Sequence, residues 1–158
     1  MYKWEEKDGH IIIYNLTNFD PFHTFHCGQC FRWNRLPNGH WLEVAYGLAL
    51  DLEWDGKNMI LYHTTPEQFL HIWHPYFDLG RDYGDLKAKL SQNDSVMAEA
   101  IRFGQGVRLL KQDFNEVAIS FLISQNNGIP RIRKIIESLS AAFGRPIEHE
   151  SGTCYAFP

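Results

Sequence analysis

Apolar residues recur at helical spacing on both sides of a polar stretch at residues 124–131. Before this stretch they fall every three or four positions over residues 114–122, which places one apolar stripe on a helix. After it the same spacing runs over residues 132–143, with Pro130 at a first-turn position where its missing N–H costs nothing. The pattern predicts two helices joined by a short polar turn.

Residues at the ends of these helices support the same interpretation. Asp113 and Glu116 form a capping pair at the start of the first helix, and Gly144 followed by Pro146 stops the second. Gly128 is suited to the left-handed residue that ends the first helix. The predicted unit is therefore a helix-turn-helix hairpin.

The corner of this hairpin presents a cluster of polar side chains. They are Gln125, Asn126, Asn127 and Arg131. Asn and Gly also favour helix ends for backbone reasons, and an arginine in a first turn is often simply solvated. From these residues alone, a structural turn and a binding site are both open.

The first half of the chain carries short runs typical of strands, separated by turn residues. We expect strands at residues 11–14, 30–33, 40–46, 48–54 and 59–62, and a loop at residues 18–25 around Pro21. Leu48, Leu50, Leu52 and Trp54 alternate with less apolar neighbours, the period of a sheet with one covered face.

Helices that could cover this sheet follow directly in the sequence. Thr65 to Gln68 has the Thr-x-x-Gln form of a capping box with Pro66 at the first helical position, and Phe69, Ile72 and Trp73 supply an apolar face. Further helices are expected at about residues 83–90 and 95–103, the second ended by Gly104.

The resulting fold class is α+β, with an antiparallel β-sheet covered by helices and followed by a helical region. We expect one domain over residues 1–104 and the start of a helical domain over residues 105–158. The tryptophans, which include Trp33, Trp41, Trp54 and Trp73, stand at strand and helix spacing. We therefore assign them to the core and not to base stacking.

Composition is typical of a globular protein, with 44% hydrophobic and 15% aromatic residues. No apolar run approaches the ~20 residues needed to span a bilayer, and the N-terminal residues lack the apolar stretch of a secretory signal. The expected location is the cytoplasm, without membrane attachment.

The net charge of −4 hides an asymmetry along the chain. Residues 1–99 carry 8 Lys and Arg against 14 Asp and Glu, whereas residues 100–146 carry 7 against 3. The basic segment contains the polar corner, as a phosphate-facing surface would require. Ordinary solvated helix faces would give the same count.

A cluster of four possible metal ligands lies at His23, His26, Cys27 and Cys30. Structural zinc usually draws its ligand pairs from separate segments, but here His26 and Cys27 are adjacent. A thioredoxin-like dithiol needs a helix N-terminus, whereas Cys30 stands where a strand is expected to begin. We therefore favour structural thiols, expect no metal or other cofactor, and expect Cys154 to form no disulfide.

Two separated motifs carry a family resemblance. Gly106-Val-Arg-Leu-Leu-Lys-Gln-Asp113 followed by Ile119-Ser-Phe-Leu-Ile-Ser-Gln-Asn-Asn-Gly-Ile-Pro-Arg131, together with Cys27-Gly-Gln-Cys-Phe-Arg-Trp33, resembles the 8-oxoguanine DNA glycosylase family of the helix-hairpin-helix superfamily. The resemblance runs from about Phe19 to the C-terminus. It implies a TBP-like N-terminal domain followed by the first helices of an all-α glycosylase domain.

Members of this family extrude 8-oxoguanine from the duplex, cleave its glycosidic bond and nick the strand through a Schiff-base intermediate. The resemblance implies base-excision repair by a glycosylase and AP lyase acting on double-stranded DNA with oxidised guanine opposite cytosine. It also implies a monomer, without cofactors, that is nucleoid-associated if the source is bacterial.

The same resemblance assigns roles to four residues. Asn126 would fill the space left by the flipped base and meet the orphan cytosine, with Arg131 bonding the same cytosine. Asn127 would hold the turn, and the Gly28 carbonyl would read the lesion. A third Asn, common in the family motif, is Gly128 here, so the detailed contacts of the turn are open.

The nucleophilic lysine of the family, in a Gly-rich hairpin with a nearby Asp, has no match in this sequence. Lys134 stands at a surface-like helical position. The chain resembles an N-terminal part of such an enzyme, and we expect it to be inactive by itself. The alternatives are a non-catalytic DNA-binding module, an alkylpurine glycosylase of the same superfamily, and a metal or redox protein.

Overall fold

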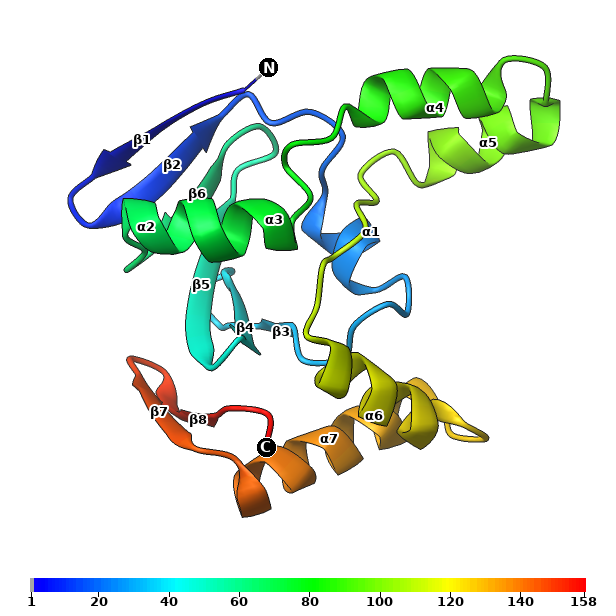
Figure 1. The fold of residues 1–158 in the computed structure, drawn as a ribbon. Coiled ribbons are helices and arrows are strands. Elements are labelled where there is room, and N and C mark those ends of the chain that lie inside the picture. Colours follow the sequence, from blue (N-terminus) through cyan, green and yellow to red (C-terminus); the bar gives the residue numbers. More distant parts are fainter. Residues whose placement is uncertain (1) are drawn as a thin grey trace.

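A six-stranded antiparallel sheet forms the N-terminal half of the α+β fold in the computed structural model, which describes residues 2–158 (Figure 1). The strand order is β1-β2-β6-β5-β4-β3. The strands are β1 (Lys3–Lys7), β2 (His10–Tyr14), β3 (Asn34–Arg35), β4 (Trp41–Ala45), β5 (Leu48–Trp54) and β6 (Met59–Tyr62). The predicted antiparallel sheet is confirmed.

Two tight hairpins fix the register of this sheet. Lys7 pairs with His10 around Asp8–Gly9, and Ala45 pairs with Leu48 around Tyr46–Gly47. All four turn residues have positive φ, between 52° and 78°, as the two-residue turns that match strand twist require. The first hairpin was not predicted, because every residue of β1 is exposed and the strand shows no apolar alternation.

A nearly continuous helix lies across one face of the sheet (Figure 1). It comprises α2 (Pro66–Gln68), a π-helical turn (Phe69–Trp73) and α3 (His74–Tyr76). The predicted capping box is confirmed, since Thr65 Oγ1 accepts from Gln68 N and Gln68 Oε1 accepts from Thr65 N. Phe69 and Trp73 are buried against the core.

The core lies between this helix and the inner face of the sheet. Leu50 and Leu52 are fully buried, while Leu48 and Trp54 are partly buried and pack against the same cluster. Trp33, Trp41 and Trp73 are also buried, which confirms that these tryptophans belong to the core. Phe25 and Trp33 stack with ring centroids 3.9 Å apart.

Two segments between β2 and β3 differ from expectation. Residues 18–25 are not all loop, because Pro21–Phe25 forms the short helix α1, capped by Asp20. Residues 30–33 are not a strand, and pairing begins only at Asn34. The reason is tertiary, since Trp33 turns into the core and its indole N–H donates to Tyr76 Oη at 3.1 Å.

The C-terminal half is mostly helical. It contains α4 (Tyr83–Ser91), α5 (Ser95–Phe103), α6 (Phe114–Ser124) and α7 (Ile129–Phe143), followed by a hairpin of β7 (Pro146–His149) and β8 (Gly152–Tyr155). The four helices were predicted, with Gly104 ending α5 and Gly144 ending α7. The β7–β8 hairpin was not, because its residues are largely exposed.

Helix α6 carries the predicted apolar stripe, but several of its apolar side chains are not covered by the described residues. Phe114, Phe121 and Leu122 are 81%, 64% and 68% exposed. On α7, by contrast, Ile132 and Ile136 are buried. Within residues 2–158 no helix is long and apolar enough to cross a membrane.

Candidate nucleic-acid interface

Helices α6 and α7 form the predicted hairpin, with the polar corner at its end (Figure 1). Asp113 starts α6, where its Oδ1 accepts from Asn115 N at 2.9 Å and Glu116 N at 3.2 Å. Helix α7 begins with Ile129 and Pro130 in its first turn. The hairpin therefore places residues 125–128 between two well-defined helix ends.

The left-handed residue of this corner is Asn126, with φ of 55°, and not Gly128 as the sequence suggested. Gly128 has φ −79° and ψ 153° and is the N-cap of α7. Its carbonyl accepts from Arg131 N at 3.0 Å and Ile132 N at 3.1 Å. Asparagine adopts the left-handed region more readily than most other non-glycine residues, so glycine was not needed at that point.

The side chain of Asn127 holds the turn. Its Nδ2 donates to the carbonyls of Ile123 at 2.7 Å and Gln125 at 3.3 Å, while its backbone N–H donates to Ser124 O at 3.3 Å. These bonds satisfy carbonyls at the C-terminus of α6. The side chains of Asn126 and Arg131 are exposed and make no hydrogen bond to the described residues.

Gly28 lies in the loop that follows α1, with φ of 88°. A Cβ atom built on it would meet nothing within 4 Å, so glycine serves the backbone conformation here and not close packing. Its carbonyl accepts no hydrogen bond from residues 2–158. Gly28 also lines a cavity of about 130 Å³ against Ser120, Phe121 and Ser124 of α6.

The structure thus brings Gly28 against the helix that carries the corner, although the two come from distant parts of the chain. The cavity lies along the side of α6, whereas the corner lies at the C-terminal end of that helix. Asn126, Asn127 and Arg131 do not line the cavity. The candidate residues therefore form two neighbouring groups and not a single pocket.

Residues that sequence reasoning missed join the Gly28 loop to the segment that leads into α6. The Gln29 side chain donates to Thr24 O at 2.8 Å and Arg108 O at 2.7 Å, and accepts from Leu110 N at 2.9 Å. The Gln29 carbonyl accepts from Gln112 Nε2 at 2.7 Å. The segment leading into α6 consequently runs beside the Gly28 loop, as Figure 1 shows. Only the position of Gln29 next to Gly28 hinted at this role.

Charged side chains tie the same loop to α6 and α7. Arg32 Nη1 lies 3.6 Å from Glu116 Oε2, and Arg133 Nη1 donates to Trp33 O at 3.1 Å. Glu43 is buried nearby on β4, where Oε2 has no hydrogen-bond partner among the described residues. Burial, and then the charge of Glu116, raise the pKa of Glu43 well above its ordinary value.

The cysteines and histidines near Gly28 do not converge. Cys30 Sγ donates to Phe25 O at 3.7 Å and is buried, whereas Cys27 is exposed. His23 Nδ1 accepts from Gly106 N at 3.2 Å, and His26 stacks on Phe22. Burial raises the pKa of the Cys30 thiol, so its reactive thiolate is disfavoured. No group of His, Cys, Asp and Glu within residues 2–158 is arranged to hold a metal ion.

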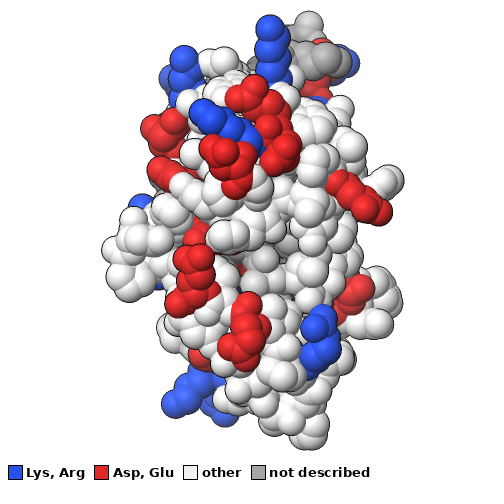
Figure 2. Space-filling model, turned by 90° about the vertical axis from the view of Figure 1, so that its left-hand side faces the viewer, with Lys and Arg blue, Asp and Glu red and all other residues white. Residues whose placement is uncertain are grey.

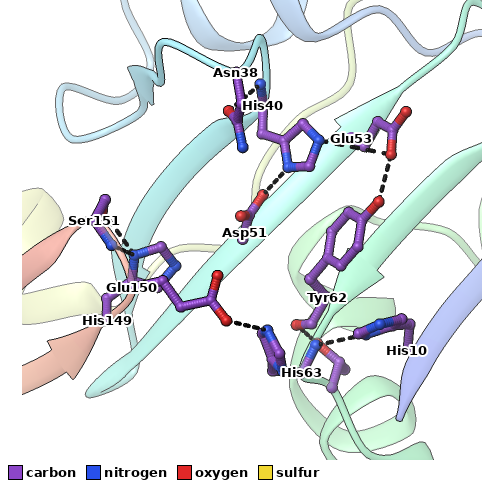
Figure 3. Close-up of polar contacts among 11 residues, drawn as sticks. His10, Asn38, His40, Asp51, Glu53, Tyr62, His63, His149, Glu150 and Ser151 are labelled. Atoms are coloured by element: carbon purple, nitrogen blue, oxygen red, sulfur yellow. Dashed lines mark hydrogen bonds and ion pairs between the residues drawn. The ribbon is translucent and has the colours of Figure 1, made fainter. Parts of the chain in front are cut away.

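The side of the molecule with β1, β2, α2 and β7 has a different character. Figure 2 shows that carboxylates are more widespread than Lys and Arg on this face. Near it, Figure 3 shows a network in which His40 Nδ1 lies 2.8 Å from Asp51 Oδ1 and His63 Nε2 lies 3.4 Å from Glu150 Oε1. Such a surface is poorly suited to phosphates, unlike the basic segment that contains the corner.

Comparison with known proteins adds an independent line of evidence. Residues 11–117 match the family model described as 8-oxoguanine DNA glycosylase, N-terminal domain. An N-glycosylase/DNA lyase OGG1 of Arabidopsis thaliana is 28% identical over 123 residues, which cover 75% of this chain and 34% of the relative. An N-glycosylase/DNA lyase of Saccharomyces cerevisiae is 44% identical over 55 residues, covering 34% of this chain and 15% of the relative.

Solved structures agree with this result. A structure of MBOgg1 in complex with a low-affinity DNA ligand aligns with a TM-score of 0.95 and 46% identity, covering 100% of this chain and 54% of the other. A Clostridium acetobutylicum 8-oxoguanine glycosylase/lyase bound to dsDNA containing cytosine opposite 8-oxoG aligns at 0.94 and 40%, covering 99% and 53%. The chain thus spans about half the length of these structures and about a third or less of the two sequence relatives.

Proposed function

Because this chain belongs to the 8-oxoguanine DNA glycosylase family, we propose that it recognises 8-oxoguanine opposite cytosine in double-stranded DNA during base-excision repair. The observation that carries the proposal is that Gly28, whose carbonyl is free, lies against α6, while the exposed Asn126 and Arg131 lie at the corner that follows the C-terminus of the same helix. The 46% identity to a DNA-bound relative supports it. We propose that residues 1–104 form the N-terminal domain and residues 105–158 begin the helical domain.

The corner is proposed to stabilise the DNA after the damaged base has been extruded. Flipping a nucleotide leaves a gap and an orphan cytosine, and the lost stacking and pairing amount to a few kcal/mol. Asn126 offers donors and an acceptor in one small group that can occupy the gap, while Arg131 offers a rigid fork of donors to the acceptors of cytosine. Asn127, already bonded to Ile123 O, keeps Asn126 in its left-handed conformation.

The Gly28 carbonyl is assigned to lesion recognition. Guanine has a bare acceptor at N7, whereas 8-oxoguanine carries an N–H there, so a fixed carbonyl accepts from the lesion and repels the normal base. The carbonyl accepts no hydrogen bond from residues 2–158, and Gly28 lines a cavity on α6. This arrangement would allow an extruded base to meet it.

The chemical steps need a nucleophile that we do not assign within residues 1–158. Lys134 is exposed on α7, with no ion pair or hydrogen bond to the described residues that would activate it. We propose that the whole protein is a glycosylase and AP lyase, that it acts as a monomer on chromosomal DNA in the cytoplasm, and that these 158 residues alone are inactive. Borohydride trapping on 8-oxoguanine DNA should give no covalent adduct with them.

Variants of the corner test the binding proposal. Asn126→Gly keeps the left-handed backbone but removes the amide, and Arg131→Ala removes the donor fork. Each should weaken binding to duplex with 8-oxoguanine opposite cytosine by roughly tenfold or more, because a well-placed polar contact to a base contributes about 1–3 kcal/mol. Fluorescence anisotropy on labelled duplex measures the affinity.

Glu137→Ala is the matched control, since Glu137 is exposed on α7 away from the corner. It should bind as tightly as the parent chain. Equal affinities for the parent and for all three variants would contradict the assignment of Asn126 and Arg131. Unchanged thermal unfolding of the corner variants would show that the loss is not one of folding.

A further inference from the structure

Both the nitrogen and the oxygen of the Gln29 side-chain amide are hydrogen-bonded, although Gln29 is next to the exposed Gly28. Its Nε2 donates to Thr24 O and Arg108 O, and its Oε1 accepts from Leu110 N, all at 2.7–2.9 Å. One side chain therefore joins the end of α1 to the segment that leads into α6. None of these partners is a group that we assign to DNA recognition.

This amide controls the orientation of the Gly28 carbonyl through covalent geometry. The Gly28 C=O and the Gln29 N–H belong to one planar peptide unit, so bonds that hold Gln29 in place restrict the rotation of that unit and with it the direction of the carbonyl. The Gln29 carbonyl is held in addition by Gln112 Nε2 at 2.7 Å. Further along the loop, Arg133 on α7 donates to Trp33 O at 3.1 Å. The loop is thus fixed at both ends.

Glycine makes such external support necessary. Gly28 has φ of 88° and open space around it, and a glycine has access to many other backbone conformations. If the peptide unit of Gly28 and Gln29 rotated by about half a turn, it would present its N–H in place of its C=O. An N–H donor is complementary to the bare N7 acceptor of normal guanine.

We propose that Gln29 is a positioning residue for lesion discrimination, which keeps the Gly28 peptide in the orientation that accepts a hydrogen bond from 8-oxoguanine and rejects guanine. This inference rests on the proposed function of the chain. It assigns Gln29 a role in specificity and none in general DNA affinity. Gln112 holds the carbonyl of the next peptide unit, Gln29–Cys30, and so helps to fix Gln29 itself.

Gln29→Met tests the proposal, because methionine keeps a similar volume but loses every hydrogen bond of the amide. Affinities are measured for three duplexes that differ only at one pair: 8-oxoguanine opposite cytosine, guanine opposite cytosine, and a tetrahydrofuran abasic analogue opposite cytosine. The ratio of the first two should fall by roughly tenfold, the value of one hydrogen bond. Binding to the abasic analogue, which has no base for Gly28 to read, should be unchanged.

Gln68→Met is the matched control, since the Gln68 side chain also bonds the backbone, accepting from Thr65 N, but lies at the start of α2. It should lower stability without altering the ratio. Amide hydrogen exchange in residues 27–30 supplies a second readout that needs no DNA, and Gln29→Met should accelerate it while Gln68→Met should not.

The outcomes distinguish a failure of the positioning role of Gln29 from a failure of the proposed function. Unchanged exchange in the loop, an unchanged ratio in folded Gln29→Met, or an equal loss on all three duplexes would overturn the positioning role. A parent chain that binds 8-oxoguanine and guanine duplexes equally would overturn the proposed function instead. In that case accelerated exchange in Gln29→Met would still show that Gln29 fixes the loop.

Discussion

At the scale of single residues, the buried acid Glu43 is an exception to the apolar core. Glu43 pairs with Leu50 in the sheet register and therefore belongs to the face that carries the core. It is only 3% exposed, and Oε2 has no hydrogen bond to the described residues. The Arg32 and Arg133 charges lower its pKa, but burial and the Glu116 carboxylate outweigh them. A protonated acid thus suits this position better than a carboxylate.

The raised pKa of Glu43 makes a pH-dependent contribution to stability. Between its ordinary value of 4.5 and its raised value, the folded state holds a proton that the unfolded state has released. The free energy of unfolding therefore falls as pH rises through this window, and the contribution present below about pH 4.5 is lost above the folded-state pKa. Burial also raises the pKa of the neighbouring Glu116, which adds a pH dependence of the same sign. The Cys30 thiol and the Tyr76 hydroxyl near Glu43 have raised pKa values that keep them neutral in this window.

Glu43→Gln should remove this decline, because the amide does not titrate. Urea unfolding of both proteins across a pH series measures it, and the variant should gain stability relative to the parent as pH rises above about 4.5. Glu99→Gln, at an exposed position on α5, is the control and should follow the parent. Parallel curves for Glu43→Gln and the parent would show that Glu43 does not titrate in this window.

At the scale of elements, the α6–α7 hairpin and the Gly28 loop each depend on one backbone conformation. Gly28 has a left-handed backbone conformation. Gly128 has an extended one, although the sequence suggested a left-handed conformation there. A Cβ atom built at either position meets no atom outside its immediate chain neighbours closer than 4.0 Å. The two glycines therefore differ in backbone strain and not in available space.

The same substitution should consequently have opposite effects at the two positions. Gly28→Ser should destabilise by about 1–2 kcal/mol, the penalty of a side chain in the left-handed region. Gly128→Ser should stabilise by a few tenths of a kcal/mol, because serine is a better N-cap than glycine and its backbone is already extended. Chemical denaturation measures both, and a loss of stability in Gly128→Ser would contradict the assigned N-cap geometry.

Helices and central strands could be predicted because their side chains repeat with the period of the element. The capping residues Thr65 to Gln68 and Asp113 indicated where helices start. The alternating Leu50 and Leu52 indicated a strand with one face covered. By contrast no residue of β1, β7 or β8 is buried, so these strands have no covered apolar face to repeat in the sequence. The failure at residues 30–33 has a different cause, since Trp33 turns into the core and ends the pattern before pairing begins.

At the scale of the whole molecule, tertiary contacts create an arrangement of the candidate site residues that no local pattern contains. The family motifs pointed to Gly28 and the corner separately, but the position of Gly28 against α6 follows from the path of residues 104–113 beside α1 (Figure 1). Gln29 and Arg133 could not be identified from spacing, because their partners are 79 and 100 positions away. The resemblance supplied the candidate residues, and the fold supplied the contacts that hold them.

The central claim is that this chain distinguishes an oxidised guanine from a normal one within a base pair. The most direct measurement is its affinity for two duplexes that are identical except for 8-oxoguanine or guanine opposite the same cytosine, compared at one salt concentration. We expect clearly tighter binding to the 8-oxoguanine duplex. Equal affinities would contradict the account, because the Gly28 carbonyl would then not read the lesion.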